Sequence, residues 1–410
     1  ELMIVKIERL DHQGRGIAKV DNITTFIPNA LVNEIVDIEI VEKKKNYNIG
    51  KVKSYIEKSN DRIEPICKYF TLCGGCDLMH MSYENQLVFK QDKVKNIIDR
   101  YTKIDSSVVK EILHSKELFY RNKVVFKVDK NIGFYDKKSY NVVPIDKCLI
   151  SSKKINEILK IIETCNLDNI NKIMIRTNEV DSLVVIYTTE ISNEIIDKLK
   201  NKCSIIKYDK KYELIIGKGY ITDKIGDYEF IISPDSFYQV NRSTVKILYD
   251  KVLEYLNPNA NDKILDLYSG TGTIGIYVSK YVKNVLSIEI NKFASKDALK
   301  NKELNNISNI DFICDDVANE IDKIKNIDSI IVDPPRSGLD NKTIEYLKKI
   351  KSKKIIYVSC DPMTLARDLD NLSEVYNVVE ITPVDMFPNT SHVECVAALY
   401  RRESKKMILN

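Results

Sequence analysis

The chain has 410 residues, 44% of them hydrophobic and 30% charged, which is enough apolar material for a substantial core and excludes a chain that is disordered as a whole. At roughly 150 residues per domain, the length suggests two or three domains. The 63 Lys and Arg residues only slightly outnumber the 59 Asp and Glu residues. Bulk charge alone would therefore not hold the chain on nucleic acid, and any such surface must be local.

The sequence contains no run of about 18 apolar residues and no pattern of a secretory leader. Its first residues alternate apolar and charged positions instead. We therefore expect a soluble, cytoplasmic protein.

Residues 1–58 predict a small antiparallel β-barrel of about five strands. Stretches of alternating apolar and polar residues, such as MIVKIERL and EIVDIEIV, are separated by Gly, Asn and Lys. The charges of this region are nearly balanced, and small barrels serve many functions. Composition alone therefore does not favour nucleic-acid binding here.

Cysteine spacing identifies a candidate metal site. Nine cysteines are placed unevenly in a large chain, which indicates metal binding or catalysis rather than a disulfide framework. Cys67, Cys73 and Cys76 form a C-x5-C-x2-C run whose two glycines allow a tight turn. Thiolates this close need a shared cation, either zinc or an iron–sulfur cluster. A fourth ligand is expected, and the candidates are Cys148, which is the nearest, Cys165 and Cys203.

Residues 59–215 predict a mixed α/β domain. A helical pattern occupies residues 82–115, and an alternating strand follows at 120–128. The basic residues of this strand share one face, and the opposite face is mostly apolar. The basic residues are Arg121, Lys123 and Lys127.

Residues 216–410 predict a doubly wound nucleotide-type domain. The segment KILDLYSGTGTIGI, which begins at Lys263, reads as a buried strand, a glycine loop and a helix. The next strand ends at Glu289, 19 residues after Gly270, where a carboxylate can accept hydrogen bonds from both hydroxyls of a ribose. This pattern favours an adenosine-containing cofactor, although it would also suit NAD.

Two later segments narrow the choice of cofactor and of reaction. In IVDPPRSGL a rigid turn holds Asp333 beside the ligand crevice, an arrangement typical of S-adenosylmethionine-dependent methyltransferases. The position after Pro-Pro is Arg336 rather than an aromatic residue, which argues against methylation of an exocyclic amine. Cys360 ends another strand and Glu394 follows a polar loop, so the two supply a nucleophile and a candidate base.

These residues together resemble the RNA (uracil-5-)-methyltransferase family. The matching motifs are CKYFTLCGGCDLMHMSYENQ, SFYQVN, ILDLYSGTGTIG, IVDPPRSGL, VSCDP and DMFPNTSHVE, in the family's order over nearly the whole chain. The resemblance implies an α/β fold with a C-terminal class I (Rossmann-like) methyltransferase domain, a central α/β domain and an N-terminal barrel similar to the TRAM module. Ser269 departs from relatives that often have cysteine there, at a position without a catalytic role.

The resemblance also implies the site residues. Cys67, Cys73, Cys76 and Cys148 would ligate a [4Fe–4S] cluster, and S-adenosylmethionine would bind Gln239, Tyr268, Glu289 and Asp333. Cys360 would attack C6 of uracil, and Glu394 would accept the C5 proton. For stacking against the extruded base, the candidates are Phe237 and Tyr238.

The resemblance makes 23S ribosomal RNA the expected partner, because members that act on ribosomal RNA carry a TRAM module. The alternatives are a transfer RNA 5-methyluridine methyltransferase and a non-catalytic RNA-binding assembly factor. An assembly factor is disfavoured because both Cys360 and Glu394 are present. A 5-methylcytosine enzyme is disfavoured because residues 333–338 lack a second cysteine. We expect a monomer that does not bind membranes.

Overall fold

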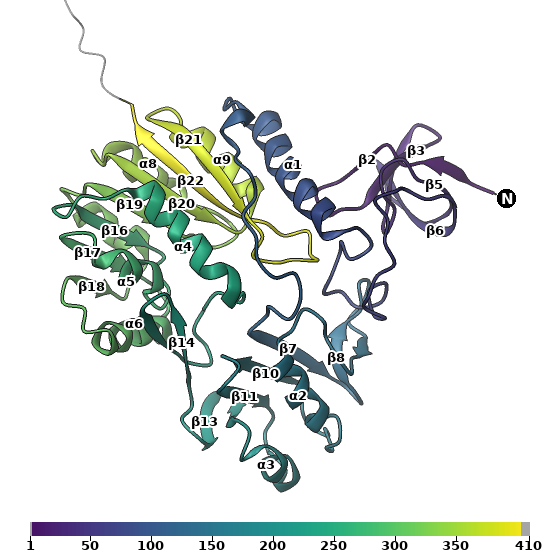
Figure 1. Ribbon diagram of the computed structural model, residues 1–410, viewed down its shortest axis with the longest axis horizontal. Coiled ribbons are helices and arrows are strands. Elements are labelled where there is room, and N and C mark those ends of the chain that lie inside the picture. The colour runs from purple at the N-terminus through teal and green to yellow at the C-terminus, as the bar shows by residue number, and fades with distance from the viewer. Residues whose placement is uncertain (1, 403–410) are drawn as a thin grey trace, which may run out of the picture.

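The structure, a computed structural model, describes residues 2–402 (Figure 1). It contains an N-terminal barrel, a central α/β unit and a larger C-terminal α/β unit, which confirms the predicted fold class. The barrel projects to one side, and the central and C-terminal units lie next to each other (Figure 1). In the described part of the chain, no helix combines the length and the apolar character that a membrane span requires.

The barrel is closed by its first segment. Residues 4–10 form β1, which pairs with β5, and then β2, which pairs with β3 at the other edge of the same sheet. One bent segment therefore joins both edges, which agrees with the prediction of about five strands. The prediction of an antiparallel barrel is wrong for one pair, because β4 and β6 run parallel. The strands are β1 (Ile4–Lys6), β2 (Arg9–Leu10), β3 (Gly16–Val20), β4 (Ile23–Ile27), β5 (Ile35–Lys43) and β6 (Tyr47–Glu57).

The central unit is a mixed sheet in the order β13-β12-β11-β10-β7-β8-β9. Two helices, α2 (Lys153–Ile162) and α3 (Asn193–Leu199), cover one face and bury alternate residues of β10 such as Ile173 and Ile175. The strands are β7 (Lys123–Val128), β8 (Ile132–Tyr135), β9 (Val142–Pro144), β10 (Lys172–Thr177), β11 (Ser182–Tyr187), β12 (Ser204–Asp209) and β13 (Lys211–Ile216).

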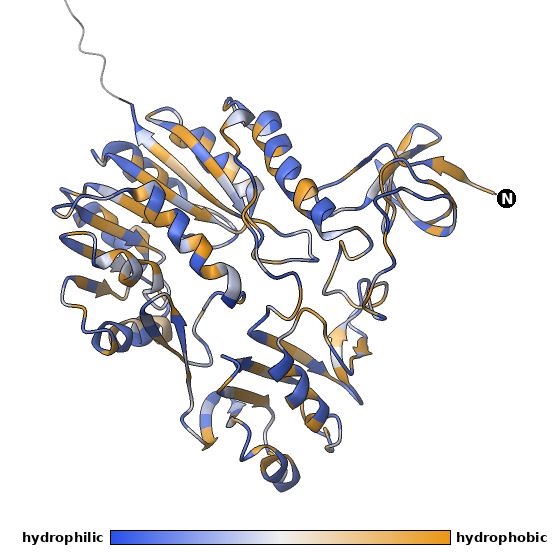
Figure 2. Cartoon of the chain, viewed as in Figure 1, coloured by the Kyte–Doolittle hydropathy of each residue, from blue (hydrophilic) through white to orange (hydrophobic). Residues whose placement is uncertain are grey.

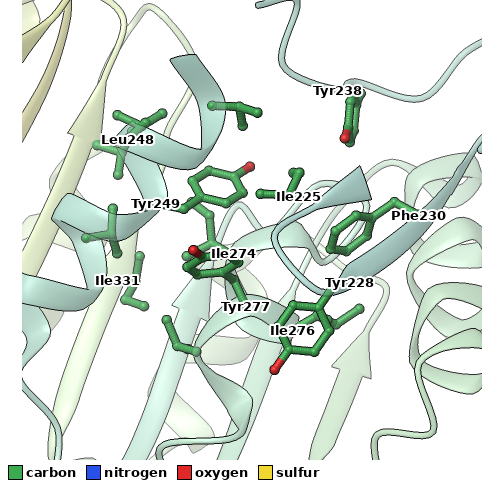
Figure 3. Packing of buried hydrophobic residues seen from close by; sticks show 14 of the residues in the cluster. Ile225, Tyr228, Phe230, Tyr238, Leu248, Tyr249, Ile274, Ile276, Tyr277 and Ile331 are labelled. Atoms are coloured by element: carbon green, nitrogen blue, oxygen red, sulfur yellow. The ribbon is translucent and has the colours of Figure 1, made fainter. Parts of the chain in front are cut away.

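The other face of the central sheet joins the core of the C-terminal unit. Met174 of β10 lies in one hydrophobic cluster with Phe230 of the hairpin β14 (Ile221–Ile225) and β15 (Tyr228–Ile232). The same cluster reaches Tyr249 and Ile274 (Figure 3). The two units therefore share a continuous core, which fixes the central unit relative to the C-terminal sheet.

The C-terminal sheet has the order β18-β17-β16-β19-β20-β22-β21. Its first five strands are parallel, and β22 runs antiparallel to both of its neighbours, β20 and β21. Hydrophobic residues run along its strands, whereas hydrophilic and hydrophobic bands alternate along helix α1 (Figure 2). Its strands are β16 (Lys263–Leu267), β17 (Asn284–Ile288), β18 (Ile310–Ile313), β19 (Ser329–Val332), β20 (Lys354–Ser359), β21 (Tyr376–Val384) and β22 (Glu394–Arg401). Its helices are α4 (Arg242–Leu256), α5 (Thr273–Ser279), α6 (Lys292–Leu304), α7 (Val317–Glu320), α8 (Asn341–Lys349) and α9 (Pro362–Leu372).

Helix α1 (Tyr83–Tyr101) is shorter than the predicted pattern over 82–115. After the short 3-10 helix at Ser106–Val108 the chain becomes extended, and the N–H of Lys110 donates to the carbonyl of Ile381 in β21. The apolar face of α1 packs in the same core as α9. The helix thus lies within the range 59–215 but covers the C-terminal sheet, and the boundaries 1–58, 59–215 and 216–410 stay a prediction.

Candidate active site

Five of the predicted site residues meet at one edge of the C-terminal sheet. Tyr268, Glu289, Asp333 and Cys360 each directly follow a parallel strand, so they lie at the carboxyl edge where such sheets bind ligands. β22 runs antiparallel to β20, and its first residue, Glu394, therefore lies at that same edge. Since Ser359 pairs with Cys395, the register places Cys360 next to Glu394.

The glycine loop after β16 leaves open space beside the backbone. Tyr268 and Gly270 have φ angles of 62° and 56°, a left-handed conformation that is costly for the tyrosine. A Cβ atom at Gly270 would meet nothing within 4 Å, so the backbone at this position faces an open space. The N–H of Gly270 donates to the Glu289 carboxylate at 2.7 Å, which joins the loop to the end of β17.

Helix α5 is fixed behind this loop by a buried hydrogen bond. The hydroxyl oxygens of Tyr249 on α4 and Thr273 on α5 are 2.7 Å apart, and Tyr249 lies beside Ile274 in the core (Figure 3). A Cβ atom at Gly272 would lie 2.8 Å from the ring of Phe312, so close packing requires glycine there. The glycine loop is therefore packed against the core at Gly272 and faces open space at Gly270.

The charges around the Cys360 thiol are mostly negative. Burial raises the pKa of Cys360 to about 11, and the carboxyl groups of Glu394 and Asp333 add to this shift. Burial also raises the pKa of both carboxyl groups, and Glu394 raises that of Asp333 further. Arg336 opposes the shifts of Cys360 and Glu394. Such an acidic pocket favours a cationic ligand, whose charge would offset the carboxylates that disfavour the thiolate.

Gln239 lies on the segment between β15 and α4. Its side chain is buried, and its backbone carbonyl accepts a hydrogen bond from the Asn122 side-chain amide at 3.0 Å. Phe237, which is 63% exposed, is available for stacking on a base. The prediction that Tyr238 stacks on the target is wrong, because this ring is only 4% exposed and belongs to the shared core (Figure 3).

The loop that leads into Glu394, residues 385–391, is held by the N-terminal half of the chain. The Lys93 ammonium group donates to the Ser391 carbonyl at 2.8 Å, and the Gln86 side chain exchanges two hydrogen bonds with Asn389. The Asp77 carboxylate accepts from the Ser391 N–H at 3.0 Å. Because Asp77 follows Cys76 directly, the cysteine segment touches the loop that positions Glu394.

The four predicted cluster ligands line one hollow of about 450 Å³. Burial raises the pKa values of Cys67, Cys73 and Cys76, and Cys148 raises all three further, so the four thiols lie close enough to interact electrostatically. Among residues 2–402, no group of three or more His, Cys, Asp or Glu side chains is placed to hold a metal ion. The [4Fe–4S] cluster therefore stays a prediction, which rests on the convergence of these thiols.

Several residues of this site were not predicted. Asp266 is fully buried in β16 beneath the glycine loop, and burial raises its pKa to about 7. The sequence feature that could have identified Asp266 is a carboxylate in the middle of the apolar strand KILDL. Arg336 lies 3.5 Å from the His392 ring nitrogen and is close enough to Cys360 and Glu394 to lower the pKa values of both groups. Lys90 is fully buried, which its place in an ordinary amphipathic pattern gave no reason to expect.

Comparison with known proteins gives matches over nearly the whole chain. Residues 82–402 match the family described as tRNA (Uracil-5-)-methyltransferase, and residues 2–53 match the TRAM domain. An RNA methyltransferase of Caldanaerobacter subterraneus is 38% identical, with 97% of each chain covered. An RNA methyltransferase of Clostridium tetani is 36% identical over 96% of this chain and 95% of its own.

A solved structure gives the same relationship in three dimensions. The tRNA (uracil-54, C5)-methyltransferase of Pyrococcus abyssi, in complex with S-adenosyl-L-homocysteine, superimposes with a TM-score of 0.78 at 29% identity. The match covers 97% of this chain and 99% of that chain, so it includes the N-terminal barrel. A barrel of this kind therefore does not by itself separate enzymes that act on ribosomal RNA from enzymes that act on transfer RNA.

Proposed function

The chain belongs to the S-adenosylmethionine-dependent RNA (uracil-5-)-methyltransferase family, and from this premise we propose that it methylates C5 of a uridine in 23S ribosomal RNA through a covalent adduct with Cys360. The observation that carries the proposal is the pairing of β20 with β22, which puts Cys360 and Glu394 side by side. The same edge holds Glu289 and Asp333 after the neighbouring strands.

The chemistry of uracil explains why this pair is needed. C5 is a poor nucleophile until a second nucleophile adds at C6. The half-buried Cys360 thiol loses its proton to water, its sulfur forms a bond to C6, and the electron pair of the C5–C6 double bond moves into an enolate that is nucleophilic at C5. S-adenosylmethionine would supply the methyl group that C5 accepts, and its sulfur would keep the electron pair of the broken sulfur–methyl bond, which leaves S-adenosylhomocysteine.

Glu394 completes the cycle. Its carboxylate removes the C5 proton, the C5–C6 double bond re-forms, and the Cys360 sulfur leaves with its electron pair. The raised pKa of Glu394 suits this role, because a base works best when its pKa lies near the operating pH. Arg336, beside both residues, is placed to offset the negative charge of the enolate.

The proposal assigns the remaining predicted residues to binding. Glu289 would accept hydrogen bonds from the ribose hydroxyls, with the open glycine loop at Gly270 beside it. Tyr268, Gln239 and Asp333 would line the same cofactor site. Cys67, Cys73, Cys76 and Cys148 would hold a [4Fe–4S] cluster, supported by their shared hollow. The cluster would act structurally, because uracil methylation transfers no net electron. We place this protein in the cytoplasm as a monomer.

A second candidate substrate is transfer RNA. The specific observation in its favour is the Pyrococcus abyssi enzyme, which is named for uridine 54 of tRNA and matches the barrel as well as the other two units. The test is methylation of purified 23S ribosomal RNA and of bulk transfer RNA, both lacking 5-methyluridine, with labelled S-adenosylmethionine. Label in 23S RNA alone supports the proposal, and label in transfer RNA alone supports the second candidate. Label in neither refutes both.

A further inference from the structure

A second hollow, of about 590 Å³, lies at the junction of the central and C-terminal units, away from the cysteines. Five chain segments meet around it: residues 116–120, the start of α2, the turn between β10 and β11, β14 and the start of α4. The residues that line it are Lys116, Leu118, Phe119, Tyr120, Lys153, Glu179, Lys224, Arg242 and Ser243.

The hollow carries an excess of positive charge. Arg242 is neutralised by Asp223, to which its Nε donates at 2.9 Å. Lys116, Lys153 and Lys224 form no ion pair with any carboxylate of residues 2–402. Glu179 is the single acidic residue among the lining side chains. Three ammonium groups without an ion-pair partner therefore converge from separate segments on a cavity that has one carboxylate in its lining besides the Arg242–Asp223 pair, and this excess of positive charge favours an anionic ligand.

An aromatic ring adds to the cations. Phe119 has a φ angle of 55°, a left-handed conformation that is strained for a bulky residue and is held by the hydrogen bond from its N–H to the Leu149 carbonyl. Its ring lies 5.7 Å from the Lys147 ammonium group and 5.6 Å from that of Lys153. An aromatic ring that is only half-buried among cations is the combination that binds unpaired nucleotides by stacking and by phosphate contact.

Residues at or beside the wall of the hollow form hydrogen bonds with the loop that leads into Glu394, residues 385–391. Tyr120, at its wall, donates its hydroxyl to the Pro388 carbonyl at 2.9 Å. Asn241, next to Arg242, donates to the Met386 carbonyl at 3.2 Å. A ligand in the hollow would therefore lie against Tyr120, which is bonded to the loop that leads into Glu394, and against Arg242, the sequence neighbour of Asn241.

We propose that this hollow is a second RNA subsite, which binds an unpaired nucleotide near the extruded uridine through phosphate contacts from Lys116, Lys153 and Lys224 and through stacking on Phe119. The inference rests on the proposed RNA methylation and goes beyond it, because it assigns these residues to substrate binding outside the catalytic pocket. The shared chemistry is a phosphate group, which either the RNA backbone or a free nucleotide can supply.

The test compares two triple variants that lose the same charge. In the first, Lys116, Lys153 and Lys224 are replaced by Ala. In the control, Lys283, Lys325 and Lys351 are replaced by Ala; these exposed lysines precede β17, β19 and β20 and so lie at the opposite edge of the sheet. RNA affinity is measured against KCl concentration, and the cofactor affinity of each variant is measured by calorimetry.

The hollow variant should bind RNA at least about 10-fold more weakly at about 0.15 M KCl and should lose about two units of log–log salt slope, as expected for three phosphate contacts on single-stranded RNA. The control should change neither value, and cofactor affinity should stay constant in both. Phe119→Leu should weaken binding at least about 5-fold without changing the slope, because stacking carries no charge. An unchanged slope in the hollow variant overturns the inference.

A further arm separates the two sources of phosphate. Adenosine monophosphate and inorganic phosphate are titrated into the wild-type protein and the hollow variant. If these ligands bind tightly to the wild type only, while the RNA salt slopes are equal, the hollow is a small-nucleotide site and the RNA assignment is wrong. The binding arms need no turnover, so a wild-type protein that binds RNA but does not methylate it would refute the proposed function and leave this inference to be decided by the slopes.

Discussion

The ammonium group of Lys90 and the carboxylate of Asp385 form a fully buried ion pair, with Nζ and Oδ1 2.5 Å apart, between α1 and the loop that precedes Glu394. Lys90 also donates to the Phe387 carbonyl at 2.9 Å, and Tyr83 donates to the other oxygen of Asp385 at 2.8 Å. Burial lowers the pKa of Lys90, and Asp385 opposes that shift. Each charge therefore offsets part of the free-energy cost of removing the other from water.

Replacing Lys90 by Met should destabilise the protein by about 3–5 kcal/mol, because Asp385 would remain buried without a counter-charge. The measurement is the shift of the denaturant-induced transition. The control is Lys246→Met, which removes an exposed pair with Asp250 on α4 and should cost about 0.5 kcal/mol or less. Equal decreases in the free energy of unfolding of the two variants would contradict this account.

The second prediction separates the roles of Cys360 and Glu394. Cys360→Ala should form no covalent complex and should lose methylation almost entirely, because the C5 nucleophile never forms. Glu394→Gln should still attack and methylate but should not release the product, so an adduct carrying labelled methyl should accumulate on a denaturing gel. Normal turnover by Glu394→Gln would assign proton removal to another group, such as His392.

The third prediction concerns pH. Burial raises the pKa of Glu394 to about 7, and only the carboxylate can take the C5 proton. Resolution of the methylated adduct should therefore accelerate about 10-fold between pH 6 and pH 8, as the ionised fraction rises through this pKa. Rapid-quench kinetics of adduct decay give the rate at each pH. A rate that is constant over this range would exclude Glu394 as the titrating base.

The fourth prediction concerns the cysteines. Anaerobically purified protein should be brown and contain about four irons per chain. Ser in place of Cys67, Cys73, Cys76 or Cys148 should lower the iron content and bleach the colour. The matched controls are Cys165→Ser and Cys203→Ser, since both cysteines pack on the core beneath α2 and α3 instead of lining the hollow. Stoichiometric zinc without iron would contradict the prediction.

The order of residues along the chain was enough to predict which candidate residues lie together, although their roles stay a prediction. Tyr268, Glu289, Asp333 and Cys360 each directly follow a strand, and parallel strands bring such positions to one edge of the sheet whatever the loops do. The sequence did not predict which side chains are buried by packing between distant segments of the chain. Lys90 occupies a position that an amphipathic pattern leaves open to solvent, and only the docking of α1 on the C-terminal sheet buries it.

The hollow beside Phe119 was beyond prediction for the same reason. Its cations come from segments more than a hundred residues apart, such as Lys116 and Lys224, and each is an ordinary surface lysine in its own segment. The strands of the barrel could be predicted from the sequence, whereas the kind of RNA that it helps to bind could not. Its strands follow from period-two alternation, whereas the choice between ribosomal and transfer RNA depends on surfaces that alternation does not describe.

The place of β22 in the sheet sets the order in which the enzyme can be completed during synthesis. β22 lies between β20 and β21, although both of those strands are translated before it. Until residues 394–401 arrive, β20 has an open edge, β21 is not joined to the rest of the C-terminal sheet, and Cys360 has no neighbouring Glu394. A chain interrupted before that point would carry Cys360, the proposed nucleophile, without Glu394, its proposed base. Under the proposed mechanism, such a nascent or truncated chain could not complete a catalytic cycle.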